Sequence, residues 1–257
     1  MARVFITGSS DGLGLMTGRL LADEGHRVVL HGRNDARAAD AKRALPEAEA
    51  VVVGDLASIA ATKDLAAQVN ALGPFDAVIH NAAVGYREGQ RLTSDGVPHL
   101  FAINTLAPFI LTMLIERPKR LVYLSSGMHE RANANLDDIF WRKRPWDGSS
   151  AYAESKLHDV MLAFTVARLW KNVLSNAVTP GWVATKMGGA GAPDDIAQAH
   201  LTQAWLATSD DAEAKTTGGY FYHLKRREPN REAREESVQD RLVDICQEIS
   251  GVNMPWS

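Results

Sequence analysis

The 257-residue sequence predicts an α/β fold with one doubly wound parallel sheet of about seven strands and helices on both faces. Short apolar runs alternate with segments of helical periodicity along the whole chain. Most of these runs are continuously apolar, which is typical of strands covered on both faces. The length suits one α/β domain. We therefore expect residues 1–257 to form a single domain.

Seven strands are expected where short apolar runs are bounded by turn residues: Arg3–Thr7, Arg27–His31, Ala50–Val53, Ala77–His80, Arg120–Ser125, Leu174–Val178 and Tyr220–His223. Six helices are expected between them: Gly14–Glu24, Asn34–Ala44, Ile59–Leu72, Pro98–Ile115, Tyr152–Trp170 and Asp194–Ala207. An amphipathic helix, Glu232–Ser250, is expected within a C-terminal extension, residues 224–257. That helix either covers the sheet, joins a homodimer or binds another protein.

The composition is that of a soluble globular protein. Hydrophobic residues make up 46%, charged residues 23%, and the net charge is −3. No global charge favours nucleic acid or an anionic membrane, and no stretch reaches the roughly 18 apolar residues of a membrane span. The first strand begins almost at Met1, which leaves no room for a signal peptide. Cys246 is the one cysteine, so a reducing compartment is permitted, and we expect a cytoplasmic protein.

Tyr152 and Lys156 are the most informative pair in the sequence. They are four residues apart in an expected helix, so their side chains are neighbours. A tyrosine needs its pKa lowered by about 3 units, worth about 4 kcal/mol, to ionise at neutral pH. A positive charge at about 4 Å and an effective dielectric constant of about 20 supplies a similar amount. The spacing therefore predicts a general acid and base.

A glycine-rich turn lies at the other end of the chain. Three glycines, Gly8, Gly12 and Gly14, follow an apolar strand and open a helix. Such glycines allow a tight turn and close approach of a pyrophosphate to the backbone, and the helix N-terminus faces the anion. The spacing is G-x-x-x-G-x-G and not the more familiar G-x-G-x-x-G. Its position at the start of a βαβ unit predicts a dinucleotide site.

Polar and small residues follow six of the expected strands. Ligands of doubly wound sheets bind beyond the carboxyl ends of the strands. The residues placed there are Gly8 and Ser9, Arg33, Asp55, Asn81 and Ala82, Ser125 and Ser126, and Pro180 and Gly181. We expect them to meet at one edge. The eight histidines and one cysteine show no metal-ligand spacing, so no metal site is expected.

These motifs, in this order, resemble the short-chain dehydrogenase/reductase family over nearly the whole chain. The matching residues are Thr7-Gly8-x-x-x-Gly12-x-Gly14, Asp55-Leu56, Asn81-Ala82-Ala83, Asn104, Ser125-Ser126, Tyr152-x-x-x-Lys156 and 180–185. The stretch 122–129 and the long gap between Ser126 and Tyr152 resemble the branch of retinol dehydrogenases and WW-domain oxidoreductases. The resemblance implies a Rossmann fold, a nicotinamide cofactor and a carbonyl or alcohol substrate.

The resemblance assigns roles to individual residues. Tyr152 would be the acid and base, and Lys156 would lower its pKa and bind the nicotinamide ribose. Ser126, with Ser125 as the alternative, would bind the substrate oxygen. Asn104 would hold a water linked to the lysine, although a structural hydrogen bond is the other interpretation of a buried amide.

The remaining implied positions contact the cofactor. Asp55 and Leu56 would flank the adenine, Asn81 and Ala82 the adenosine ribose, and Thr185 the carboxamide. The full set of cofactor positions is Gly8, Ser9, Ser10, Gly12, Leu13, Gly14, Arg33, Asp55, Leu56, Asn81, Ala82, Tyr152, Lys156, Pro180, Gly181, Val183 and Thr185.

Arg33 bears on the choice of cofactor. NAD sites usually carry an acid at the end of the second strand, on the ribose 2′-hydroxyl. Here that strand ends His31-Gly32-Arg33-Asn34, and a guanidinium binds a 2′-phosphate through charge-assisted hydrogen bonds. We therefore expect NADP(H) over NAD(H), with Ser9 and His31 assisting. Asp35, two positions further, could instead turn toward the ribose.

The sequence thus predicts an NADP(H)-dependent oxidoreductase acting on a small-molecule carbonyl or alcohol. His129–Ser150, which contains Trp141 and Trp146, and Met187–Pro193 are expected to shape a fairly hydrophobic substrate pocket. A homo-oligomer, either dimer or tetramer, is expected. The alternative function is a non-catalytic NADP(H) sensor, although such proteins tend to lose the tyrosine or lysine.

Overall fold

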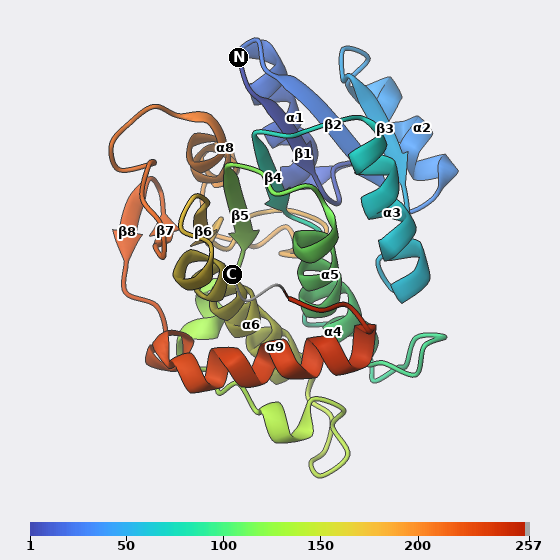
Figure 1. Cartoon of the computed structure of the whole chain (residues 1–257), viewed down its shortest axis with the longest axis vertical. Coiled ribbons are helices and arrows are strands. Elements are labelled where there is room, and N and C mark those ends of the chain that lie inside the picture. The colour runs from blue at the N-terminus through green and yellow to red at the C-terminus, as the bar shows by residue number, and fades with distance from the viewer. Residues whose placement is uncertain (255–257) are drawn as a thin grey trace.

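A computed structural model describes residues 1–254 and confirms the doubly wound α/β class and the Rossmann fold. Within these residues, eight strands form one sheet in the order β3-β2-β1-β4-β5-β6-β7-β8 (Figure 1). The strands are β1 (Arg3–Ile6), β2 (Arg27–Gly32), β3 (Ala50–Val53), β4 (Ala77–His80), β5 (Arg120–Leu124), β6 (Leu174–Val178), β7 (Tyr220–Tyr222) and β8 (Lys225–Arg227). β1 to β7 run parallel, and β8 is antiparallel to β7.

Helices cover both faces of the sheet (Figure 1). The described helices are α1 (Gly12–Asp23), α2 (Asp35–Ala44), α3 (Ile59–Ala71), α4 (His99–Phe101), α5 (Ala107–Leu114), α6 (Gly148–Leu169), α7 (Ile196–Ala199), α8 (Leu201–Thr208) and α9 (Glu236–Ser250). Successive strand residues face opposite layers, as the pleat requires. Phe5 of β1 packs in the layer of α3, α5 and α6, whereas Val4 and Ile6 pack in the layer of α1, α2 and α8.

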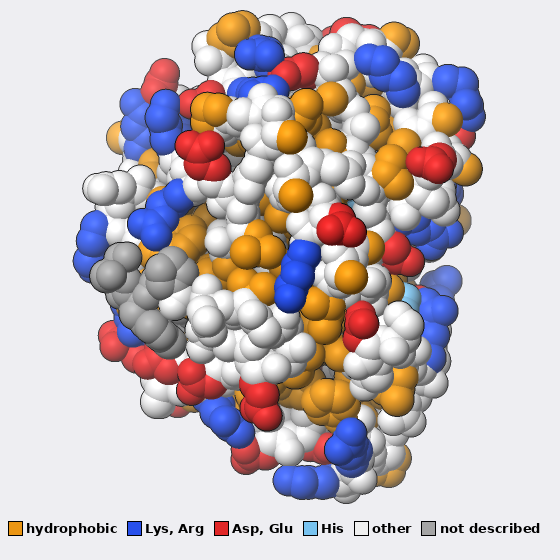
Figure 2. All heavy atoms as spheres, turned by 45° about the vertical axis from the view of Figure 1, so that its right-hand side comes forward, with side chains coloured by type: hydrophobic (Ala, Val, Ile, Leu, Met, Phe, Trp, Pro, Cys, Tyr) orange, Lys and Arg blue, Asp and Glu red, His pale blue; other side chains and the backbone are white. Residues whose placement is uncertain are grey.

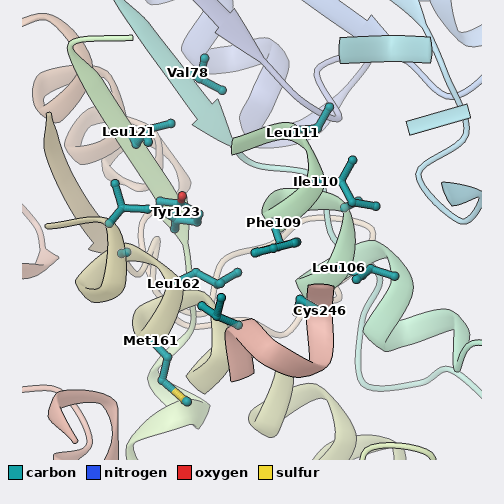
Figure 3. Packing of buried hydrophobic residues seen from close by; sticks show 14 of the residues in the cluster. Val78, Leu106, Phe109, Ile110, Leu111, Leu121, Tyr123, Met161, Leu162 and Cys246 are labelled. Atoms are coloured by element: carbon teal, nitrogen blue, oxygen red, sulfur yellow. The ribbon is translucent and has the colours of Figure 1, made fainter. Parts of the chain in front are cut away.

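The amphipathic C-terminal helix is bound within the same chain. α9 crosses the outer side of α6, where Leu242, Val243 and Cys246 are fully buried (Figure 1). Figure 3 shows Cys246 in the same cluster as Phe109 of α5 and Leu162 of α6. α9 thus covers the helix layer on one face of the sheet. Its apolar stripe is occupied by this packing, which leaves little of it for another protein.

The eighth strand, β8, differs from prediction, because residues 225–227 were expected in an extension without a strand. Lys225, Arg226 and Arg227 are all exposed and carry no apolar pattern, so nothing marks them as a strand. His223 and Leu224 join β7 to β8 and both have positive φ angles, as a tight hairpin turn needs. Charged side chains on such an edge hinder pairing with another sheet.

Several helix boundaries also differ from prediction. The segment expected as Pro98–Ile115 contains a π-helical turn, Ala102–Leu106, between α4 and α5. α6 begins at Gly148 and not at Tyr152, because Asp147 caps it by accepting a hydrogen bond from the Ser150 amide at 2.7 Å. The segment expected as Asp194–Ala207 is divided into α7 and α8, and α9 begins at Glu236 after a short 3-10 turn.

One face of the protein carries side chains of mixed character. Figure 2 shows acidic and basic side chains interspersed over this face, with hydrophobic side chains between them, several of them gathered near its middle. This mixture is typical of a solvated surface. Among residues 1–254, no helix combines the length and apolar character needed to cross a bilayer.

Buried histidines make stability depend on pH. Burial lowers the pKa of His80 to about 3, whereas the unfolded chain takes up the proton near 6.5. Through His80, the free energy of unfolding of the protein should therefore fall by about 2 kcal/mol as the pH falls from 7 to 5. We expect His80→Asn to be less stable than wild type at pH 7. Between pH 7 and pH 5, however, its free energy of unfolding should fall by about 2 kcal/mol less than that of wild type, as measured by urea unfolding. Parallel stability curves for the two proteins would contradict this account.

Candidate active site

The glycine turn between β1 and α1 is tightly packed on one side and open on the other. A Cβ atom at Gly14 would lie 2.5 Å from the Asn81 amide nitrogen and 2.7 Å from the Gly8 carbonyl oxygen. A Cβ at Gly8 would lie 2.7 Å from the Cα of Ala82, and Gly8 has a φ of +61°. A Cβ at Gly12 would meet nothing within 4 Å. The open side and the α1 N-terminus fit a pyrophosphate, so the turn can hold a dinucleotide.

Hydrogen bonds couple this turn to the end of β4. The Thr7 hydroxyl accepts from the backbone amides of Asn81 and Ala82, each at 3.0 Å. The Asn81 side chain donates back to the carbonyl oxygens of Thr7 at 2.9 Å and Gly8 at 3.1 Å. The predicted Asn81 and Ala82 therefore meet the predicted Gly8 and Gly14 at one edge of the sheet.

Ser9 and His31 do not turn toward the open side. The Ser9 hydroxyl donates to Ile6 and accepts from the His31 amide, and its side chain is fully buried. The His31 ring accepts from the Gly8 amide and donates to the Gly54 carbonyl, each within 2.9 Å. Burial lowers the pKa of His31, which is consistent with a neutral ring. Their side chains stabilise the turn, so the predicted assistance to a 2′-phosphate gains no support from this geometry.

Arg33 emerges at the end of β2 as an exposed side chain that forms no ion pair with any residue in 1–254. Its neighbour Asn34 caps α2 by accepting a hydrogen bond from the Arg37 amide. Asp35 lies in the first turn of α2, where a negative charge stabilises the helix. The structure thus leaves the Arg33 guanidinium available at the edge where the ribose of a dinucleotide would lie.

Asp11 lies within the glycine turn and binds two cations. Its carboxylate pairs with Arg37 of α2 at 2.6 Å and with Lys186 of the loop after β6 at 2.7 Å. Burial alone would raise the Asp11 pKa, but Lys186 and Arg37 outweigh it and hold the pKa below its usual value. These three residues are distant in sequence and match no motif, so no local pattern indicates that they meet.

The remaining predicted cofactor residues occupy the same edge with unequal exposure. Asp55 is exposed after β3, whereas Leu56 is 6% exposed and packs in the core. After β6, Gly181 has a φ of +86°, and Val183 is buried. The Thr185 hydroxyl accepts from the Gly188 amide at 3.1 Å, which shapes the loop. Ser10, Leu13 and Pro180 are partly buried beside these turns.

Tyr152 and Lys156 lie on one face of α6, as their spacing predicts. The Lys156 ammonium is 5.7 Å from the centroid of the Tyr152 ring. It donates to the Leu124 carbonyl at the end of β5, at 2.7 Å, and to the Asp159 carboxylate at 2.8 Å. The lysine side chain is 4% exposed and that of the aspartate is 3% exposed. The Lys156–Asp159 pair is thus a buried ion pair.

Tyr152 is protonated in this arrangement. Burial raises its pKa most strongly, and the charges of Asp159 and Tyr86 add to the rise. Lys156 and the Ser126 hydroxyl lower the pKa, as the sequence analysis expects of the lysine, but the net pKa stays above its usual value. The effect of Lys156 thus has the expected direction, and the burial of the phenol outweighs it.

The two serines after β5 differ in their surroundings. The Ser125 hydroxyl is buried and donates to the Lys156 carbonyl at 2.7 Å, which ties β5 to α6. The Ser126 hydroxyl accepts from the Met128 amide at 3.3 Å, stays partly exposed and lies beside the Tyr152 phenol. The geometry therefore favours Ser126 over Ser125 as the residue that could meet a substrate.

Asn104 lies in the π-helical turn, a feature that is frequent at functional sites. Its amide accepts from the Val84 amide at 2.8 Å and donates to the Val84 carbonyl and the Ser155 hydroxyl, each at 3.0 Å. These contacts fix the chain after β4 against α6. They match the structural interpretation of this buried amide, and the predicted role in holding a water stays a prediction.

Apolar side chains cover Tyr152. Its ring meets that of Tyr86 edge-on, with centroids 6.1 Å apart, and only 7% of the residue is exposed. Tyr152, Trp141, Leu100 and Ala151 form one cluster, against which Val84, Tyr86, Trp146 and Met187 pack. Trp141 and Trp146 contact each other edge-on at 5.1 Å. Both predicted loops thus contribute residues beside the tyrosine.

His129 is a structural residue. It is fully buried, its Nδ1 bonds the Ser126 carbonyl oxygen at 2.7 Å, and its Nε2 accepts from the Asn230 amide. Burial lowers its pKa. No group of three or more acidic, histidine or cysteine side chains among residues 1–254 is arranged to hold a metal ion.

Fold and site together define an α/β protein with an open glycine turn and with a neighbouring tyrosine and lysine at the carboxyl edge of its sheet. Residues 2–126 match the family model described as short chain dehydrogenase. The chain is 45% identical to "Uncharacterized oxidoreductase AN7799" of Emericella nidulans, over 99% of both chains. It is 28% identical to human retinol dehydrogenase 13, covering 98% of this chain and 85% of that protein.

Solved structures share the fold. A putative uncharacterized protein from Mycobacterium paratuberculosis has a TM-score of 0.85 and 25% identity, covering 99% of this chain and 95% of its own. A blue fluorescent protein from a metagenomic library, solved with NADPH, has a TM-score of 0.70 and 23% identity, covering 86% of this chain and 95% of its own. The chain belongs to the short-chain dehydrogenase/reductase family. It is an oxidoreductase of the kind that acts on CH–OH and C=O groups.

Gly14→Ala tests the glycine turn. The new methyl group would collide with Asn81 and Gly8 and force the turn open, so we expect the affinity for NADPH to fall about tenfold or more. Gly89→Ala is the matched control, since a Cβ there meets nothing within 4 Å. Fluorescence titration with NADPH measures both. Equal affinities for the two variants would show that close packing at Gly14 does not govern binding.

Proposed function

We propose that this protein is an NADP(H)-dependent oxidoreductase that interconverts a fairly hydrophobic carbonyl compound and its alcohol. The observation that carries the proposal is the cluster of Tyr152, Lys156 and Ser126. Ser126 lies just after the carboxyl end of β5, and Tyr152 and Lys156 lie near the start of α6, at the sheet edge that also carries the glycine turn. The family membership supports the reaction class.

The preference for NADP(H) rests on charge at the end of β2. Arg33 is exposed there, and the strand ends without an acid that would bind the 2′-hydroxyl of NAD. A protein of the same fold binds NADPH, which is consistent with this preference. The guanidinium would form charge-assisted hydrogen bonds with a 2′-phosphate.

The substrate class rests on the residues around Tyr152. Tyr86, Met187, Val84 and Trp146 supply aromatic and aliphatic surface beside the phenol. Such surface favours an apolar substrate body next to the reacting oxygen. Because the phenol is nearly enclosed, binding of a substrate requires these side chains to move apart.

The mechanism follows from these positions. Bound NADP(H) supplies or accepts the hydride. In reduction, Tyr152 donates its phenolic proton to the substrate oxygen, and in oxidation it takes that proton back. Ser126 donates a hydrogen bond to the same oxygen. Lys156 places its positive charge beside the phenol and has a third N–H available for the cofactor ribose.

Tyr152→Phe removes the proposed proton donor without changing the shape of the cluster. We expect NADPH consumption with a panel of hydrophobic aldehydes and ketones to fall by about 10²-fold or more, while NADPH affinity changes little. Spectrophotometry at the NADPH band and fluorescence titration measure the two quantities. If wild type binds NADPH tightly but neither protein consumes it with any substrate, the sensor function gains the support that the reductase loses.

Arg33→Ala tests the cofactor preference. Loss of hydrogen bonds to a charged phosphate should weaken NADPH binding by about tenfold to a hundredfold, and NADH binding should change little. Arg226→Ala, on the exposed outer strand β8, is the charge-matched control. An unchanged ratio of NADPH to NADH affinity in Arg33→Ala would refute the role of this residue.

A further inference from the structure

Asp159 is a buried carboxylate that the proposed reaction does not yet use. It lies three residues after Lys156 and seven after Tyr152, on the same face of α6. It is 2% exposed, and its Oδ2 is 2.8 Å from the Lys156 ammonium. Sequence spacing alone could have indicated it, because it is an acid one turn beyond a lysine within a helix whose residues are otherwise largely apolar.

Three ionisable groups therefore share one buried site. With Lys156 and Asp159 both ionised and Tyr152 protonated, the net charge of the three is zero. Release of one more proton leaves a net charge of −1 in surroundings that solvate it poorly. Without the carboxylate, the same step would change the net charge from +1 to zero. Asp159 thus makes the site hold its proton more strongly, whichever of Tyr152 and Lys156 releases it.

Among residues 1–254, Lys156 is the one cation whose charge acts on Tyr152 and Asp159. From β5, Tyr123 faces Asp159, and burial with the nearby carboxylate raises the Tyr123 pKa further above its usual value. From the chain after β4, Tyr86 faces the Tyr152 ring. The His80 ring packs against that of Tyr123 at a tilt, with centroids 4.7 Å apart, and it is neutral because burial lowers the His80 pKa to about 3. Burial likewise raises the pKa of Asp159 to about 6, against the effect of Lys156, so the pair is ionised at neutral pH.

We propose that Asp159 is a positioning residue that fixes the Lys156 ammonium at the end of β5, keeps Tyr152 protonated and thereby poises the site for carbonyl reduction. The inference rests on the proposed oxidoreductase function and adds that the site favours the direction of carbonyl reduction over that of alcohol oxidation. In reduction the phenol must donate a proton, so a site that retains its proton at neutral and mildly alkaline pH is ready for that step. In oxidation the same site must first lose the proton.

Asp159→Asn separates this role from a purely structural one. Asparagine has nearly the same shape, and its amide oxygen can still accept the hydrogen bond from Lys156, but it carries no charge. A structural role would lower stability and leave the pH dependence unchanged. A role in holding the proton would shift the pH dependence.

The first measurement is the pH profile of kcat/KM in both directions. For Asp159→Asn we expect the alkaline fall of carbonyl reduction and the rise of alcohol oxidation to move to lower pH by about one unit or more. Asp159→Glu keeps the carboxylate and should stay within a few tenths of a unit of wild type. Asp244→Asn on the exposed side of α9 removes the same charge from the protein and should also match wild type.

The second measurement uses the protein without cofactor or substrate. The near-ultraviolet absorbance of phenolate, titrated in wild type and in Tyr152→Phe, gives the ionisation of Tyr152 by difference. We expect its midpoint above the ordinary tyrosine value of about 10. This test needs no Asp159 variant, so it stands even if Asp159→Asn does not fold.

Two results would overturn the proposal. One is an Asp159→Asn protein that folds, turns over and keeps the wild-type pH profile. The other is a wild-type Tyr152 midpoint below about 10. If wild type shows no NADPH-dependent turnover at all, the proposed function fails, and the same absorbance titration in Asp159→Asn still decides whether Asp159 holds the proton on Tyr152.

Discussion

The buried ammonium of Lys156 is the charge on which the geometry of the site depends. A buried cation must be paired and hydrogen-bonded, and here the Leu124 carbonyl and Asp159 meet that requirement. Because Leu124 ends β5 and Lys156 lies on α6, their hydrogen bond fixes the helix against the strand, while Asp159 holds the ammonium from the same helix. The Ser125 hydroxyl repeats this connection through the Lys156 carbonyl. Tyr152, one turn earlier on α6, is thereby held beside Ser126 at the end of the sheet.

A second constraint joins this centre to the glycine turn. Four hydrogen bonds join Thr7 and Gly8, after β1, to Asn81 and Ala82, after β4. Gly8 and Gly14 also approach this part of the chain too closely for a side chain. Asn104 then fixes Val84, a few residues further, against α6. The proposed cofactor edge and the proposed acid-base centre are thus parts of one hydrogen-bonded network around the chain after β4.

The sequence predicted the parts of this fold that depend on local pattern. Apolar runs indicated β1 to β7, and the helical spacing of Tyr152 and Lys156 brought them to one face of α6. Prediction from local pattern failed where tertiary contacts or a single cap determine the structure. β8 consists of three exposed charged residues, and the early start of α6 depends on the Asp147 cap. Ser9 and His31 were expected to assist Arg33 at a 2′-phosphate, yet their hydrogen bonds turn inward. The Asp11–Lys186 pair joins residues 175 positions apart, a separation that no local pattern reveals.

The most direct test of the central claim follows one hydrogen isotope through the reaction. Wild-type protein would be incubated with NADPH deuterated at the transferable C4 position and with a hydrophobic aldehyde or ketone. Mass spectrometry and nuclear magnetic resonance would then locate the label. The account predicts one deuterium on the carbinol carbon of the alcohol product, with the hydroxyl proton drawn from solvent through Tyr152. An alcohol product without deuterium at that carbon would contradict it.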